Sequence, residues 1–468
     1  MRRLKAESPA PPAPRTSARP PRTVAPGPRK AAPMNLTRRS LLASASGATL
    51  LGGLAACGGD SASGDSSAGG GGGGGGGSKD LTIWFMEDSV PQETQDRLKE
   101  TFESENEGAT LTIEVQQWDG IVSKLQTSLA SEDESPDVVE FGNTQVALFS
   151  SVGALLDISD QEETLGGGDL IQSFIDAGSW EGKLYATPLY AGARVYYYRK
   201  DLFAAAGIAE PTSLDELVAA AKALDAANPE GNPDFSGIYM PGADPHTNEG
   251  WLFTHGGQYA EQDGDTWKGT LSSPESQAAL TQVQDLMLHA TKYALDSNEN
   301  VQAAHQLFND GKLGIYSALN VAAAKIDQAM WDAGKVAVMA LPGLTPGSIG
   351  KTFSGGSSIG ISANNHNLEL SKALLKLIYA DDFMTDMAKI GGWIPGRTSF
   401  TSALEGPTGS IAQEIIENSV LTPNSPQWGV LDGNNVPRDF WVRIAKGEDV
   451  KTVAADLDKT IADALNQS

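Results

Sequence analysis

From residue 80 onward, short apolar runs alternate with helix-forming segments, and this alternation restricts the fold more than any other feature. Residues 81–86 (LTIWFM) are a β-rich apolar run, residues 111–115 (LTIEV) alternate as a strand, and residues 137–141 (DVVEF) have the pattern of a buried strand. Between them, a helix is expected after Pro91 with its apolar residues turned inward, and a second helix is expected over residues 120–130. Strands that alternate with helices predict βαβ units, a parallel sheet and an α/β fold.

The same alternation continues to the C-terminus. No internal repeat of 20–50 residues is visible, which argues against solenoids and propellers. Further strands are expected at 193–198, 313–316, 336–341 and 358–361, and helices at 214–227, 274–294, 299–310, 320–333, 368–383 and 450–465.

Charge is distributed unevenly along the 468 residues. Residues 1–56 hold ten basic residues and one acidic residue, which leaves 24 Lys and Arg against 58 Asp and Glu in the remainder. The formal net charge of −25 argues against a nucleic-acid-binding protein. A hydrophobic content of 40% over this length is enough for a sizeable core.

An export signal is predicted over residues 34–56. It begins with a charged stretch, residues 34–42 (MNLTRRSLL), and continues through an apolar region to small residues before Cys57. The paired Arg38 and Arg39 fit a twin-arginine signal as well as an ordinary secretory signal. Residues 1–33 contain nine of the 25 prolines and are expected to be a disordered upstream extension, with Met34 the true start.

The single cysteine excludes an intramolecular disulfide and a Cys-based zinc site. Residues 54–57 (LAAC) resemble the lipobox of bacterial lipoproteins, so we predict that Cys57 is lipidated. Residues 57–78 are rich in Gly and Ser and are predicted to be a flexible tether, with a reach of about 25 Å for a random coil. No later run approaches the roughly 18 apolar residues of a membrane span.

The sequence matches motifs of known enzymes only poorly. Residues 356–360 (GSSIG) match the serine-hydrolase elbow, but that motif needs a strand before the serine and a helix after it, whereas here a Gly-rich loop precedes and a strand is expected to follow. His246 and His255 lie near Asp244 and Glu249, although a surface loop is a better interpretation than a metal site. No metal or cofactor is therefore expected. Paired carboxylates for glycoside hydrolysis remain open in so acidic a chain.

Aromatic and polar residues follow the ends of the first three predicted strands. Trp84 lies at the end of the first strand, Trp118 follows the second, and Glu140 and Asn143 end the third. Ligands of open α/β sheets bind just beyond the carboxyl ends of the strands. This placement predicts a site for a polar, ring-shaped ligand such as a sugar.

Several motifs together resemble a known family. They are residues 136–144 (PDVVEFGNT), 188–203 (PLYAGARVYYYRKDLF), 241–244 (PGAD) with 255–257 (HGG), 267–269 (WKG) with 272–275 (SSPE), and 355–358 (GGSS). Over about residues 80–468 the chain resembles family 1 extracellular solute-binding proteins. These are sugar receptors of ABC importers, built like maltose-binding protein, and the chain looks most similar to actinobacterial receptors for chitobiose, N-acetylglucosamine and related oligosaccharides.

The resemblance implies a two-lobe periplasmic-binding-protein-like fold of type II, with a ligand cleft between lobes joined by crossing strands. Lobe one would hold residues 79–190 and 345–395, and lobe two residues 191–344 and 396–468. It implies a monomeric, non-catalytic receptor on the extracellular face of the cytoplasmic membrane, held by the lipid on Cys57. The partners would be a mono- or oligosaccharide and the permease subunits of the importer, with no nucleic acid and no cofactor.

By the same resemblance, twelve residues would line the cleft. In physical terms Trp251 and Trp393 could stack on sugar rings, Glu140 and Asp244 could accept hydroxyl hydrogen bonds, and Arg194 could donate a fork of hydrogen bonds. The full set is Trp84, Glu140, Asn143, Tyr190, Gly192, Arg194, Asp244, Trp251, Asn320, Gly356, Ser357 and Trp393.

The chain departs from the family at two places where relatives often carry an aromatic residue. It has Pro245 and His246 after residues 241–244, and it reads SALN at residues 317–320. Loss of two aromatic contacts changes the expected specificity. Two alternatives stay open: an exported polysaccharide hydrolase or lyase, and a receptor for a non-sugar such as a polyol, a polyamine or a phosphodiester.

Overall fold

The structure is a computed structural model that describes residues 79–118, 120–192, 194–264, 266–296 and 304–467. The upstream extension 1–33, the export signal 34–56, Cys57 and the tether 57–78 lie outside the described residues. In the described part of the chain, no helix has the length and apolar character needed to cross a membrane.

A six-stranded sheet forms around the strands that the first part of the sequence predicts. Its strand order is β15-β6-β14-β3-β1-β2, and β1 is parallel to both β2 and β3, as predicted. The other half was not predicted: β14 runs antiparallel to β3 and β6, and β15 antiparallel to β6. The strands are β1 (Asp80–Met86), β2 (Thr110–Gln116), β3 (Val138–Gly142), β6 (Ala186–Ala191), β14 (Gly356–Ile361) and β15 (Ile394–Pro395).

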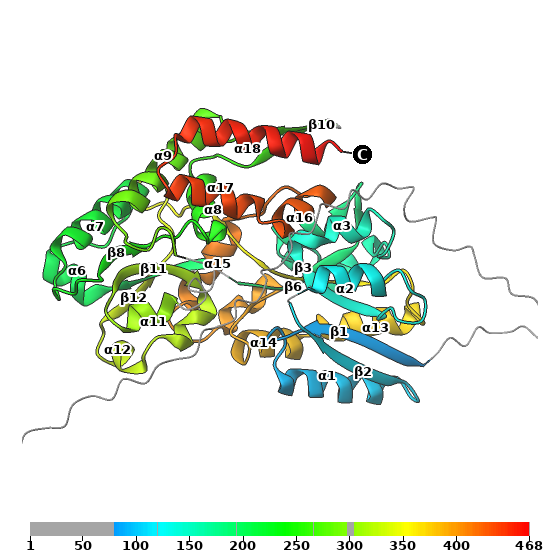
Figure 1. The fold of residues 1–468 in the computed structure, drawn as a ribbon. Coiled ribbons are helices and arrows are strands. Elements are labelled where there is room, and N and C mark those ends of the chain that lie inside the picture. The colour runs from blue at the N-terminus through cyan, green and yellow to red at the C-terminus, as the bar shows by residue number, and fades with distance from the viewer. Residues whose placement is uncertain (1–78, 119, 193, 265, 297–303, 468) are drawn as a thin grey trace, which may run out of the picture. The chain divides into compact units, whose positions relative to one another are not determined.

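Helices on this sheet bury one apolar face each. In α1 (Gln92–Glu105), Leu98 and Phe102 are buried, which confirms the predicted inward side. This helix packs against α13 (Leu368–Ile378) and α14 (Asp381–Lys389), two segments from a distant part of the sequence (Figure 1).

A four-stranded sheet of order β12-β7-β11-β8 forms a second centre. Its strands are β7 (Arg194–Arg199), β8 (Ser236–Tyr239), β11 (Leu313–Leu319) and β12 (Val336–Met339). Its core also contains residues of α7 (Leu214–Ala227), α9 (Pro274–His289), α17 (Val436–Ala445) and α18 (Val450–Leu465). The helices predicted over 214–227 and 450–465 are thereby confirmed.

The chain passes directly from one sheet to the other between β6 and β7, and it passes again between β12 and β14. On that second path, β13 (Thr352–Phe353) pairs in parallel with β16 (Ser419–Val420). Ala191 and Val195, which flank the first crossing, are fully buried in a shared hydrophobic cluster with Ile394. Two α/β lobes joined by crossing strands are therefore present, as expected.

The remaining elements are short. The helices are α2 (Ile121–Ser128), α3 (Val146–Ser150), α4 (Glu162–Leu165), α5 (Gln172–Gly178), α6 (Lys200–Ala206), α8 (Pro245–Thr254), α11 (Ala304–Asn309), α12 (Gln328–Asp332), α15 (Gly409–Glu417) and α16 (Pro426–Gly433). The strands are β4 (Ser179–Trp180), β5 (Lys183–Leu184), β9 (Ala260–Asp263) and β10 (Thr266–Gly269).

Two long helices of the sequence prediction are wrong because each is interrupted. Residues 320–333 form a 3₁₀ helix, η4 (Asn320–Lys325), followed by α12. The side chain of Asn309 donates to the carbonyl of Lys325 and accepts from the N–H of Asp327, and these bonds replace helical hydrogen bonds between the two elements. Residues 368–383 divide into α13 and α14 at Ala380, whose backbone is extended. The predicted helix 274–294 ends at His289. Of the helix 299–310, only α11 falls within the described residues.

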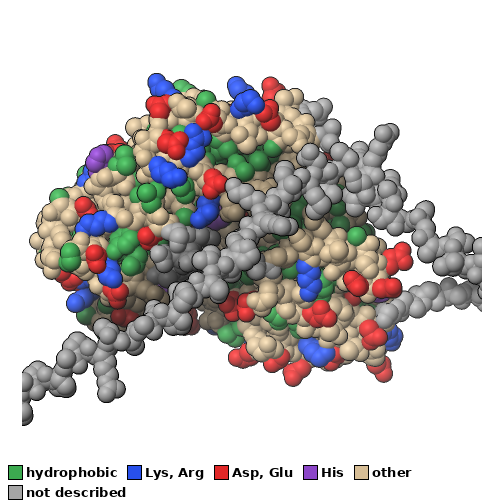
Figure 2. All heavy atoms as spheres, in the orientation of Figure 1, with side chains coloured by type: hydrophobic (Ala, Val, Ile, Leu, Met, Phe, Trp, Pro, Cys, Tyr) green, Lys and Arg blue, Asp and Glu red, His purple; other side chains and the backbone are tan. Residues whose placement is uncertain are grey.

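Acidic side chains are spread over both lobes on the face that Figure 2 shows, with fewer basic ones among them. This agrees with the net charge of the chain, and such dispersed like charge favours solubility.

Candidate functional site

An aromatic cluster, made of Tyr190 and Trp393, lies beside the crossing between the two sheets. The rings are 4.5 Å apart with planes inclined by 33°. Strand pairing positions them, because β14 and β15 place Ser357 and Pro395 on either side of Tyr190. Ser357 donates a hydrogen bond of 3.1 Å to the Tyr190 hydroxyl. Trp393 is only partly buried, so one side of this cluster remains accessible.

Glu140 lies behind the aromatic cluster and is fully buried. Its Oε2 accepts hydrogen bonds from the backbone N–H of Met86 (2.8 Å) and the hydroxyl of Ser89 (2.7 Å). Burial raises the pKa of Glu140 to about 7, although these hydrogen bonds and the neighbouring Ser357 act to lower it. The carboxyl group has no surface exposed to solvent.

We expect Glu140→Gln to change how stability depends on pH. The raised pKa means that the folded protein favours the neutral form of Glu140. The contribution of Glu140 to the free energy of unfolding is therefore fully present below about pH 4.5, and it is lost as the pH rises through about 7. Gln mimics the neutral form at every pH. The unmodified protein should therefore lose stability between pH 5 and pH 8, whereas Glu140→Gln should not. The difference between their free energies of unfolding should change by about 3 kcal/mol in favour of Glu140→Gln.

Denaturant unfolding at the two pH values measures this difference. The exposed Glu132→Gln is a matched control that should run parallel to the unmodified protein. Parallel behaviour of Glu140→Gln would contradict the expectation.

The second cluster is an ion pair at the start of β7. The Nη1 of Arg194 lies 3.0 Å from the Oδ2 of Asp244 and donates to the Thr247 hydroxyl at 2.8 Å. Asp244 is held in place as the N-cap of α8, where its Oδ1 accepts from the Thr247 N–H. Burial acts to raise the pKa of Asp244, but the charges of Arg194 and His246 and the hydrogen bonds from Thr247 together outweigh it, and the pKa is lowered. The Asp244 carboxyl group is therefore ionised at neutral pH.

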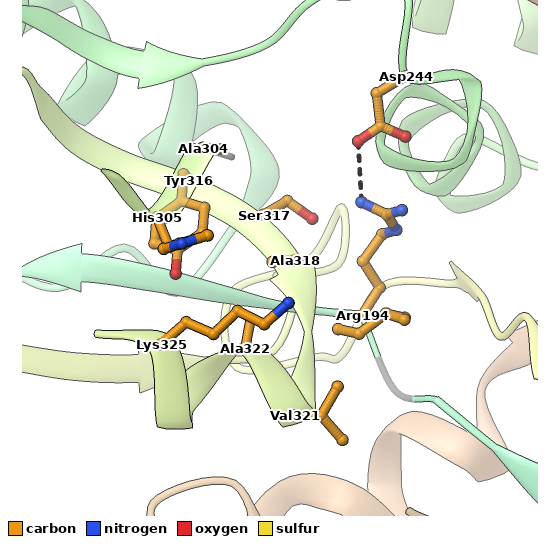
Figure 3. Close-up of a pocket in the computed structure, with 11 residues that line it drawn as sticks. Arg194, Asp244, Ala304, His305, Tyr316, Ser317, Ala318, Val321, Ala322 and Lys325 are labelled. Carbon is orange, nitrogen blue, oxygen red and sulfur yellow. Dashed lines mark hydrogen bonds and ion pairs between the residues drawn. The ribbon is translucent and has the colours of Figure 1, made fainter. Parts of the chain in front are cut away.

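Arg194 and Asp244 line a pocket of about 130 Å³, which we call the β11 pocket (Figure 3). Its remaining wall comes from the end of β11, the η4 turn and the start of α11. These residues are Ala304, His305, Tyr316, Ser317, Ala318, Leu319, Val321, Ala322 and Lys325.

Backbone contacts tie the aromatic cluster to the β11 pocket. The N–H of Gly192 donates to the carbonyl of Gly355 at 2.8 Å, and the amide of Asn320 donates to the carbonyl of Gly392 at 2.6 Å. Asn320 directly follows β11, and Gly392 directly precedes Trp393. The amide of Asn143 similarly donates to the Ser354 carbonyl at 3.2 Å. The side-chain amides of Asn143 and Asn320 are therefore bonded to backbone carbonyls of neighbouring segments, and they connect these segments to one another.

Two predicted tryptophans are not brought to the pocket. Trp251 is fully buried in the core of lobe two, where its Nε1 donates to the Tyr196 hydroxyl at 2.9 Å. Trp84 is buried against α2, and the ammonium of Lys124 lies 4.6 Å from its ring centre. Both side chains are occupied by packing in this conformation.

Sequence reasoning missed Lys325, Tyr316 and His305 as lining residues. Ser317 was noticed in the sequence only because residues 317–320 differ from the family pattern, and it was not predicted to bind a ligand. What identifies these residues is strand register, because β11 pairs with β7 so that Leu319 lies opposite Arg194 and Ser317 opposite Tyr196. Non-local pairing of this kind cannot be seen in the sequence.

The histidines considered for metal binding have other partners. The Nδ1 of His246 lies 2.8 Å from Glu249, and its ring stacks on Phe353 with centroids 4.1 Å apart. His255 contacts the Gln282 side-chain oxygen at 3.0 Å. Over the described ranges, no group of three or more potential metal ligands occurs. Residues 356–360 are strand throughout β14, so the serine-hydrolase elbow does not form there.

Sequence comparison places this fold in a family. Residues 86–385 match the bacterial extracellular solute-binding proteins, and the chain belongs to that family. The diacetylchitobiose binding protein DasA of Streptomyces coelicolor is 30% identical over 393 residues, which cover 82% of this chain and 90% of that protein. The mannitol-binding protein of Pseudomonas aeruginosa is 34% identical over 128 residues, 26% of this chain and 29% of that protein.

Solved structures share the fold. The sugar-binding protein MalE of Xanthomonas citri superposes with a TM-score of 0.72 at 20% identity, covering 82% of this chain and 97% of its own. The GacH receptor of Streptomyces glaucescens gives a TM-score of 0.68 at 22% identity, covering 83% and 98%. These likenesses confirm the two-lobe α/β fold of the binding-protein type.

Proposed function

We propose that this protein captures a mono- or oligosaccharide between its lobes and delivers it to an ABC importer. The observation that carries the proposal is the placement of the aromatic cluster and the Arg194–Asp244 pair on either side of the β6–β7 crossing. An aromatic face suits the apolar side of a sugar ring, while the ion pair and nearby hydroxyls suit its polar edge. The name of the DasA relative, a diacetylchitobiose binding protein, supports the same ligand class.

Lobe closure is the proposed binding motion. We assign residues 79–190 and 345–395 to lobe one and residues 191–344 and 396–468 to lobe two. The hinge would comprise the β6–β7 crossing, where only residues 192–193 separate the two sheets, and the paired strands β13 and β16 beside the second path between them. Ligand contacts from both lobes would stabilise the closed form.

Attachment to the outer face of the cytoplasmic membrane through a lipid on Cys57 forms part of the proposal. Its support is the order of charged start, apolar region, LAAC and Gly/Ser tether in the sequence. Mass spectrometry of the exported protein would detect the lipid on the Cys57 peptide, and an unmodified Cys57 peptide would contradict this part.

A thermal-shift screen of the purified protein against mono- and oligosaccharides tests the main proposal. A ligand at one hundred times its Kd adds about 2.7 kcal/mol to the free energy of unfolding, which raises Tm measurably. The panel should include mannitol, because of the mannitol-binding relative. A response to polyols alone would favour that second candidate, and turnover of a bound glycoside would favour an enzyme.

We expect Trp393→Ala to weaken sugar binding about fivefold, because one aromatic contact contributes about 1 kcal/mol. Trp393→Phe should retain most of the affinity, since a flat ring remains beside Tyr190. Isothermal titration calorimetry measures both. Trp118→Ala is the control, because Trp118 is 40% exposed and belongs neither to the aromatic cluster nor to the lining of the β11 pocket. Equal affinities of Trp393→Ala and Trp118→Ala would contradict a ligand role for Trp393.

A further inference from the structure

Hydrogen-bond donors without an acceptor gather in the β11 pocket. The Nε–H of Arg194 and the hydroxyl of Ser317 are buried on the same face of the sheet, and neither has a hydrogen-bond partner among the residues that the structure describes. The hydroxyl of Tyr316 is also buried without a partner there, but it lies on the opposite face of β11. An unpaired buried donor costs free energy, and an arginine Nε–H cannot act as an acceptor. A ligand group that accepts hydrogen bonds would satisfy the donors of Arg194 and Ser317.

The pocket offers few acceptors of its own. Among the described residues that line it, Asp244 is the one carboxylate, and both of its oxygens already accept hydrogen bonds: Oδ2 from Arg194 and the Thr247 hydroxyl, and Oδ1 from the Thr247 N–H. A neutral sugar hydroxyl both donates and accepts, so it matches such a donor-rich lining only in part.

Lys325 adds an unpaired positive charge at the same place. Its side chain extends along the pocket toward Ala318, while the Ser317 hydroxyl points toward Arg194 (Figure 3). Within the described ranges, no carboxylate lies within 4.0 Å of the Lys325 ammonium, although acidic residues greatly outnumber basic ones in this chain. The pocket therefore carries an excess of positive charge inside an acidic protein.

We propose that the β11 pocket binds the carboxylate of a sugar acid, such as a uronic acid residue. This inference rests on the proposed function and specifies its substrate class. A carboxylate only accepts hydrogen bonds, which matches the free donors of Arg194 and Ser317, and its charge pairs with Lys325. The volume of about 130 Å³ is suited to a carboxylate and the adjoining part of one ring.

Calorimetric titration of the full-length protein with galacturonate and glucuronate mono- and disaccharides provides the test. Galactose, glucose, N-acetylglucosamine and the uronate methyl esters serve as neutral probes. We expect one uronate series to bind at least tenfold more tightly than its methyl esters. Lys325→Gln should reduce uronate affinity about tenfold, leave methyl-ester affinity unchanged and reduce the salt dependence of binding. Lys268→Gln, an exposed lysine on β10, is the matched control and should change neither.

The outcomes separate this inference from the proposed function. If neutral sugars bind as tightly as uronates, or if Lys325→Gln weakens acid and ester equally, the inference fails while the sugar-receptor proposal stands. If no sugar of either kind binds, both fail. Selective loss of uronate affinity in Lys325→Gln, with folding unchanged by circular dichroism, would establish the carboxylate subsite.

Discussion

Replacing Arg194 by Met should lower the free energy of unfolding by about 3 to 5 kcal/mol, because the substitution leaves the charge of Asp244 buried without its partner. The two side chains are only 13% and 7% exposed, so water compensates only weakly for the lost ion pair. Met preserves much of the side-chain volume, and the loss therefore reports the charge rather than a cavity. Chemical denaturation at pH 7 measures it.

Two further variants identify the cause of that loss. In Arg194→Met with Asp244→Asn, no buried charge remains, and we expect most of the lost stability to return. Arg443→Met is the surface control, since Arg443 pairs with the solvent-exposed Glu448 and Asp456 and its loss should cost less than about 1 kcal/mol. Similar losses for Arg194→Met and Arg443→Met would disprove the structural role of the buried pair.

Gly356→Ala should lower the free energy of unfolding by about 2 to 3 kcal/mol and weaken sugar binding as well. A Cβ at Gly356 would lie 2.3 Å from the carbonyl oxygen of Tyr190 and 2.9 Å from the Cα of Ala191. Because both neighbours are backbone atoms of the paired strand β6, the strands must separate. That movement displaces Tyr190 and the aromatic cluster with it. Denaturation and calorimetric titration of the same variant report the two effects.

A second glycine provides the matched control for this prediction. Gly429 lies inside α16, and the nearest atom to a Cβ there is the Thr144 carbonyl oxygen at 3.9 Å, an ordinary contact. Gly429→Ala should therefore stabilise the protein by up to about 1 kcal/mol through helix propensity. An unchanged Tm in Gly356→Ala would show that β6 and β14 can separate without cost.

Local pattern explains why the first part of the fold could be predicted. The strands and helices from β1 to β3 have their apolar residues at the spacing of the buried face, and consecutive parallel units need no information from distant segments. Where tertiary contacts replace helical hydrogen bonds, as Asn309 does between Lys325 and Asp327, the predicted helix was wrong.

The residue types of the site could be predicted from the sequence, but the packing of the folded chain decides which of these residues come together. Sequence and family resemblance selected Tyr190, Arg194, Asp244 and Trp393, and the structure places them in two clusters beside one crossing. A tryptophan suits a sugar platform and a hydrophobic core equally well, so only the packing of lobe two shows that Trp251 is a core residue.

The sequence by itself determined the α/β class, the family and the residue types available for binding, because these follow from local hydrophobic periodicity and short motifs. The tertiary structure alone decided the antiparallel half of the first sheet, the burial of Glu140, and the meeting of Lys325 and Ser317 with Arg194. Those features depend on the pairing of strands more than one hundred residues apart, such as β7 with β11 and β3 with β14. Such pairing is set by the packing of the whole chain and leaves no local signal in the sequence.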